Sequence, residues 1–230
     1  MVEYVLTILA GMLAAIVVIS FHEFSHAFVA YKCGDPTAKF SGRMTLNPVK
    51  HFDPLGLLTF ALVGFGWAKP VPVNPNNFKN YKWGSFWTSA AGIITNYLMA
   101  FLFYPLLWVV LKYLSPLTAG TYGQIFIEYL FAYFYLYSLS FCVFNLLPVY
   151  PLDGFRIMDA FNTRRGKVYW FLRQYGYWIL LGLMLFSYAA RTIPGLAVLD
   201  VFGYAMRFTK DFIGRPITAF WGLFDVVVWI

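Results

Sequence analysis

The stretch Phe21-His22-Glu23-Phe24-Ser25-His26 lies inside an apolar run, residues 4–31, that contains almost no other charge. In a helix, His22 and His26 are four residues apart and lie on one face, one turn above the other. Two imidazoles at that spacing can bind one metal ion, usually zinc. Glu23 is turned about 100° away from His22, so it can lie beside the metal and take a proton from a water molecule.

The same residues can also occur by chance on a surface helix, because water-exposed helices tolerate His and Glu freely. Here the surrounding run is apolar, and it would carry two His and one Glu into hydrocarbon. Ionisable residues at membrane depth are costly and usually serve a function. The position of the motif therefore favours a metal site.

The composition predicts an all-α polytopic membrane protein. Of the 230 residues, 60% are hydrophobic and 12% are charged, whereas soluble domains carry about 25% charged and 45–50% apolar residues. A bilayer core of about 30 Å needs about 20 apolar residues to cross it. About four transmembrane helices are expected, at residues 4–31, 85–111, 125–147 and 168–190.

The C-terminal tail, residues 193–230, contains two shorter apolar pieces, 196–205 and 217–230. Charged residues separate them, which predicts a hairpin that spans the membrane in part or lies at its interface: Arg207, Lys210, Asp211 and Arg215. No cleavable signal peptide is expected, since Glu3 stands where a basic segment would be. The two cysteines, Cys33 and Cys142, form no C-x-x-C pair and are expected to be inert.

The formal net charge of +7 is concentrated in two loops. Seven Lys and Arg residues lie within 32–84 and four within 148–167, whereas the loop between the second and third spans has one. The positive-inside rule then places the N-terminus outside, these two loops in the cytoplasm and the His pair towards the cytoplasmic side. In such a protein the charge reports topology, so no nucleic-acid partner is expected.

The loop between the first and second spans contains an apolar piece, residues 57–65, that is too short to span. After it comes Gly66-Trp67-Ala68-Lys69-Pro70-Val71-Pro72-Val73-Asn74-Pro75, where alternate prolines bar a helix and favour extended chain. This extended, re-entrant segment could pair with an unwound substrate strand. It could equally serve only to pack against the core.

Polar residues in the second and third spans complete the candidate site. Asn96 lies in an otherwise apolar helix, where it could bond a neighbouring helix or contact a substrate backbone. The third span ends in Phe144-Asn145-Leu146-Leu147-Pro148-Val149-Tyr150-Pro151-Leu152-Asp153-Gly154, which must break the helix. Asp153 could cap the next helix or join His22 and His26 as a third ligand, which leaves a fourth position for water.

Together these motifs resemble the site-2 protease family of intramembrane metalloproteases. The resemblance rests on the H-E-x-x-H motif, on the 66–75 segment and on Asn145-x-x-Pro148-x-x-Pro151-Leu152-Asp153-Gly154, and covers residues 20–160. It implies one zinc ion per chain held by His22, His26 and Asp153, Glu23 as the base, and cleavage of substrate transmembrane helices. It also implies that Asn145 contacts the substrate or the reaction oxyanion.

The resemblance is to a minimal form in which residues 1–230 are one integral membrane domain, because no PDZ or CBS domain fits into this length. The compact form suggests a prokaryotic cell membrane. Two other functions remain open. A pseudoprotease would bind membrane helices without cutting them, and Glu23→Gln would separate the two. A zinc or proton transporter would usually show repeats or polar residues along a path, whereas the polar residues here are expected at one depth.

Overall fold

The computed structural model describes residues 1–63, 66–193 and 195–228, and the chain is 76% helical. Within these ranges the only strand-like pairing is an isolated bridge between Phe52 and Ala68. The all-α class that the composition predicts is therefore confirmed.

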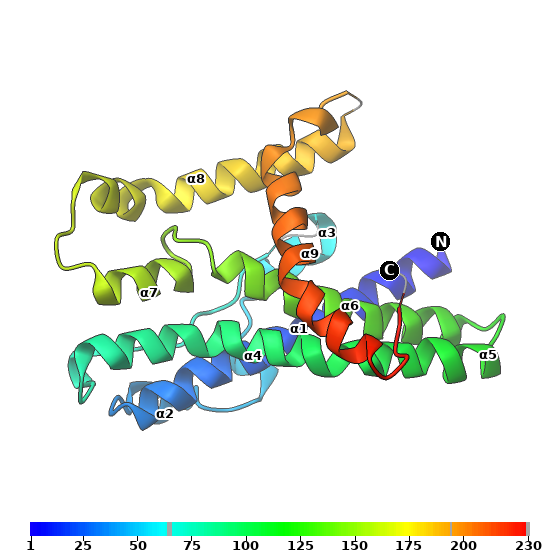
Figure 1. The fold of residues 1–230 in the computed structure, drawn as a ribbon, viewed down its shortest axis with the longest axis horizontal. Helices are drawn as coiled ribbons and strands as arrows, with labels where there is room; N and C mark the ends of the chain where they lie inside the picture. The colour runs from blue at the N-terminus through cyan, green and yellow to red at the C-terminus, as the bar shows by residue number, and fades with distance from the viewer. Residues whose placement is uncertain (64–65, 194, 229–230) are drawn as a thin grey trace.

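Three long helices form the centre of the molecule and pack against one another in every pair: α1 (Val2–Lys32), α4 (Tyr81–Val109) and α6 (Tyr122–Asn145). Figure 1 shows them running side by side along the long axis of the molecule. Small residues such as Ala10 and Ala14 are fully buried on α1. Because small side chains let helix backbones approach closely, they suit the interior of a membrane bundle.

Among the described residues, these three helices are the ones long and apolar enough to cross a membrane. The second of them, α4, continues into η3 (Val110–Leu114) and α5 (Ser115–Leu117). Their bounds lie within a few residues of three of the predicted spans. The fourth predicted span is α8 (Lys167–Thr192), which is long enough but does not reach the same apolarity. Its crossing of the membrane stays a prediction.

The loop between α1 and α4 holds short helical pieces and an extended segment. The pieces are α2 (Thr37–Phe40), η1 (Pro48–Lys50), α3 (Pro54–Val63) and η2 (Pro75–Asn77). The apolar piece predicted at 57–65 forms most of α3, and its last two residues lie outside the described ranges. With ten residues, α3 is about 15 Å long, half of what a bilayer requires. Residues 69–74, called the strap below, have no regular secondary structure.

The break after α6 leads into α7 (Asp153–Phe161), which packs against α4. α8 then returns along α7, and the rings of Phe155 and Tyr169 stack with their centres 5.3 Å apart. Charged loops and the ends of α1, α4 and α6 that carry the polar motifs therefore meet at one end of the bundle.

The predicted hairpin at 193–230 is instead one short turn, η4 (Ala197–Leu199), followed by a single helix, α9 (Val201–Gly222). Arg207, Asp211 and Arg215 are exposed and four residues apart, so they form one stripe on α9 and do not interrupt it. The charge cluster was the reason for predicting a turn, and that inference was wrong.

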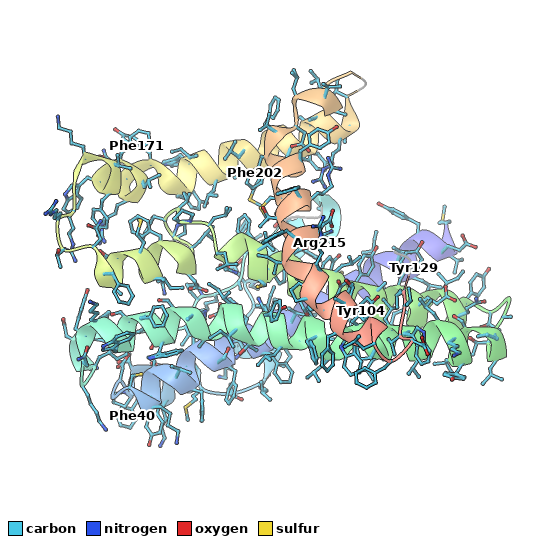
Figure 2. The ribbon with its side chains drawn as sticks, in the orientation of Figure 1. Phe40, Tyr104, Tyr129, Phe171, Phe202 and Arg215 are labelled. Atoms are coloured by element: carbon cyan, nitrogen blue, oxygen red, sulfur yellow. The ribbon has the colours of Figure 1, made fainter. Side chains whose placement is uncertain are left out.

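The opposite face of α9 crosses α4 and α6 (Figure 1). Ile217 is fully buried there in a cluster with Ala100, Tyr104 and Leu139. The Trp221 indole N–H donates to the carbonyl of Phe101 at 2.9 Å. Figure 2 labels Tyr104 where α9 crosses the bundle, and its hydroxyl accepts the amide N–H of Val228.

This packing predicts that Ile217→Ala lowers the midpoint of thermal unfolding in detergent by roughly 5 °C or more, because it leaves a cavity in a closed cluster. Ile94→Ala is the matched control, since Ile94 on α4 is 44% exposed. Equal midpoints for the two variants would contradict the docking of α9 on the bundle.

Candidate metal centre

α1 places His22 and His26 as the sequence predicts, on one face and at most 8% exposed. Their Nε2 atoms lie 3.0 Å apart and point to a common position. Two neutral imidazole nitrogens at this distance repel each other unless a proton or a cation lies between them. The pair is therefore arranged to share one proton or one cation.

Asp153 reaches the same position from the loop after α6. Its Oδ2 atom lies 3.4 Å from His22 Nε2 and 3.1 Å from His26 Nε2, and Asp153 is 6% exposed. The N-cap of α7 is Leu152, and no side chain caps this helix. The geometry thus brings the Asp153 carboxylate to the His pair, where the three side chains could hold a metal ion, and the alternative role as a helix cap finds no support.

Gly154 allows this approach, because α7 begins directly against the end of α6. A Cβ atom at Gly154 would lie 2.6 Å from the carbonyl oxygen of Leu147, closer than real Cβ atoms come to backbone. A larger residue would have to push the start of α7, and Asp153 with it, away from the His pair.

The three ligand atoms fit a zinc ion by their spacing. In a tetrahedral site with bonds of about 2.0 Å, ligand atoms lie about 3.3 Å apart. The observed separations are 3.0, 3.1 and 3.4 Å. Asp153 Oδ2 is buried and accepts no hydrogen bond from the described residues, so it has an unused lone pair directed at the shared position.

α4 supports both histidines from behind. The backbone carbonyl of Thr88 lies 2.6 Å from His26 Nδ1, and the Asn96 side chain lies 3.0 Å from His22 Nδ1. Between them, Gly92 lies against both rings: a Cβ atom there would overlap the His22 ring and come within 2.5 Å of His26 Nε2. Gly92 therefore lets α4 lie directly against the candidate metal site.

Glu23 is 9% exposed and contacts the strap. Its Oε2 atom accepts the amide N–H of Val71 at 2.9 Å. Only one carboxylate oxygen is used in this bond, and the other accepts no hydrogen bond from the described residues. Pro70 and Pro72 flank Val71 and have no backbone N–H. Within residues 70–72, Val71 is therefore the residue whose backbone can donate a hydrogen bond.

Two buried charged residues hold the ends of the strap. Arg43 donates to the carbonyl oxygens of Lys69 at 2.6 Å and Pro70 at 3.3 Å. Asp35 is fully buried and accepts the amide N–H of Asn74 at 2.7 Å and the Asn77 side chain at 2.8 Å. Burial alone would raise the pKa of Asp35, but hydrogen bonds from Thr37, Asn77 and Asn74 outweigh it and lower that pKa below its usual value.

Of the remaining predicted residues, Asn96 joins the site, whereas Asn145 makes no hydrogen bond to it within the part of the chain that the structure describes. Asn96 is fully buried and its recorded partner is His22, so it has no surface to offer a substrate. The Asn145 amide donates to the carbonyl of Phe141 in its own helix, at 3.1 Å. Sequence reasoning missed Asp35, Arg43 and the backbone donors and acceptors. The Asp35-Pro36-Thr37 turn was the available signal for Asp35.

A cavity of about 220 Å³ opens beside the centre. The strap lines it with Val71 and Val73, and α4 lines it with hydroxyl groups of Ser85, Thr88 and Ser89. α7 and α8 complete the wall with Phe155, Arg156, Asp159 and Arg173. The cavity thus extends from the strap and α4 to the charged residues of α7 and α8.

Close packing at Gly92 predicts that Gly92→Ala strongly lowers the zinc content of the purified protein, because the added methyl group displaces both imidazoles. Gly182→Ala on α8 is the matched control, since a Cβ atom there meets nothing within 4 Å. Metal analysis of both detergent-purified variants makes the comparison. Full zinc content in Gly92→Ala would show that α4 does not pack closely against the rings of His22 and His26.

Comparison with known proteins agrees with this geometry. The model of peptidase family M50 matches residues 10–188. "Putative zinc metalloprotease YwhC" of Bacillus subtilis is 43% identical over 145 residues, 63% of this chain and 65% of the relative. "Putative zinc metalloprotease Rip2" of Mycolicibacterium smegmatis is 29% identical over 170 residues, 71% of this chain and 62% of the relative.

These matches span just under two thirds of the length of either relative. No solved structure matches the chain significantly. The family match covers α1 from residue 10, the strap, α4, α6, the Asp153 loop and most of α8. The chain therefore belongs to peptidase family M50, the site-2 protease family that its motifs resemble.

Proposed function

We propose that this protein is an intramembrane zinc metalloprotease that hydrolyses peptide bonds in or near transmembrane segments of other proteins. The observation that carries the proposal is the convergence of His22, His26 and Asp153 at tetrahedral spacing, with Glu23 beside them. Membership of family M50 and the names of the two relatives agree with it.

His22, His26 and Asp153 would hold the zinc ion, one per chain. Zinc in such a three-ligand site supplies an activated water and polarises the scissile carbonyl. Glu23 takes a proton from the water through its free oxygen and later delivers it to the leaving amine. The Val71 N–H keeps the Glu23 carboxylate turned towards the site during both transfers.

The strap is the proposed docking edge for the substrate. A peptide bond in a helix is already hydrogen-bonded and shielded, so the substrate must unwind before it can be cut. The N–H of Val73 has no recorded partner among the described residues, and the cavity lies beside it. An unwound segment can add to this edge by backbone hydrogen bonds, in the manner of strand addition.

Asn145 is proposed to turn towards the substrate or the reaction oxyanion. Its amide bond to Phe141 is a local bond within α6, and the carbonyl of Phe141 lies one turn earlier in the same helix. Exchanging that bond for one to a developing oxyanion would stabilise the transition state. For Asn96 we propose no substrate contact, because it is buried behind His22.

We further propose that residues 1–230 act as one domain in a bacterial cell membrane, since both relatives are bacterial. The N-terminus lies outside and the active site towards the cytoplasm. The positive loops flank the end of the bundle that carries the site, which supports this orientation.

Glu23→Gln tests the role of the base. We expect it to abolish cleavage and to retain about one zinc ion per chain, because Gln keeps the shape but cannot accept the proton. The assay uses detergent-purified protein with a panel of labelled single-span peptides that carry Gly and Pro at mid-span. Glu3→Gln, an exposed change at the start of α1, is the matched control.

Cleavage by Glu23→Gln at the wild-type rate would remove Glu23 from the mechanism. Binding of the peptides by the wild type without any cleavage, with zinc present, would favour the pseudoprotease.

A further inference from the structure

One face of α4 repeats the spacing of the histidines on α1. Thr88, Gly92 and Asn96 are four residues apart, and they meet His26 and His22 in antiparallel order. Thr88 and Asn96 each reach an Nδ1 atom, which is the ring nitrogen that points away from the shared metal position. α4 therefore contacts the rear of both imidazoles at once.

The chemistry of the ring fixes what each rear contact must be. A neutral imidazole that binds metal through Nε2 carries its proton on Nδ1 and needs an acceptor there. At His26 the acceptor is the Thr88 carbonyl, 2.6 Å away and in the backbone of a long helix. At His22 the partner is a side chain, and it must also present an oxygen.

As placed, Asn96 presents its Nδ2 atom to His22 Nδ1 at 3.0 Å, so two N–H donors would face each other. Its Oδ1 atom is buried and has no partner among the described residues. The two ends of an amide have nearly the same shape, so their assignment follows from the hydrogen bonds. A half turn of the amide puts Oδ1 opposite the Nδ1–H and removes the conflict.

We propose that Asn96 is a positioning residue of the metal centre, whose Oδ1 atom accepts the Nδ1–H of His22 and fixes its tautomer and ring orientation. Full burial of Asn96 excludes water as a competing acceptor. The role rests on the metal site of the proposed function, but it does not depend on any cleavage. It differs from simple bonding between helices, because the acceptor oxygen is what matters.

The test is a competition titration of zinc between the full-length, detergent-purified protein and a fluorescent zinc chelator. Asn96→Leu keeps the size of the side chain but removes the acceptor, and we expect it to weaken zinc binding roughly 10- to 100-fold. Asn96→Asp keeps an oxygen at the same place, and we expect its zinc affinity to equal or exceed that of the wild type.

Thr95→Val is the matched control, a change of similar size at the neighbouring position of α4, and it should leave zinc affinity unchanged. Unfolding midpoints of the zinc-free proteins are measured alongside. If Asn96→Leu does not fold, Asn96→Asp still decides the matter. A zinc affinity of Asn96→Asp roughly 10-fold or more below that of the wild type would overturn the proposal, because it would mean that the amide nitrogen is required.

Wild-type affinity in a folded Asn96→Leu protein would equally overturn it and leave Asn96 as a bond between helices. Loss of peptide cleavage in Glu23→Gln and loss of zinc affinity in Asn96→Leu are separate readouts. Failure of the proposed protease activity therefore cannot be mistaken for failure of this inference.

Discussion

Two imidazoles and one carboxylate meet in the interior of an apolar bundle, and the structure around them follows from the need to balance that charge. An isolated carboxylate or imidazolium at this depth would be costly. The Nε2 atoms of His22 and His26 and the Oδ2 atom of Asp153 lie 3.0 to 3.4 Å from one another, so a single cation can contact all three. Each residue lies on a different turn or element, and the arrangement exists only when α1 and the loop after α6 are packed together.

The packing depends on positions without side chains. Gly92 lets α4 lie directly against the His pair, and Gly154 lets α7 begin against the end of α6. The same closeness brings the Thr88 carbonyl and the Asn96 side chain to the rear of the rings. The strap adds a contact from the loop, through Val71 to Glu23, and Asp35 and Arg43 hold it in place. The position of the strap and the orientation of the Glu23 carboxylate are therefore linked.

The side chains of this site could be predicted from the sequence, because H-E-x-x-H places His22 and His26 on one helix face and Asp153 follows a helix break. The backbone contacts could not be predicted. Nearly every residue carries an N–H and a carbonyl, so nothing in the sequence singles out the N–H of Val71 or the carbonyl of Thr88. Asn96 was recognised as a polar residue needing a partner, but the sequence could not name His22 as that partner. The C-terminal hairpin was mispredicted because charge was read along the chain, whereas Arg207, Asp211 and Arg215 share one face of α9.

The proposed function depends on one zinc ion held by two imidazoles and one carboxylate. X-ray absorption at the zinc edge of the detergent-purified protein tests it most directly, because it reports the number and kind of ligand atoms. We expect two imidazole ligands and further oxygen ligands, all at about 2.0–2.1 Å, with no sulfur. A sulfur shell near 2.3 Å would bring Cys33 or Cys142 into the site, and a spectrum with one imidazole or none would contradict the pairing of His22 with His26.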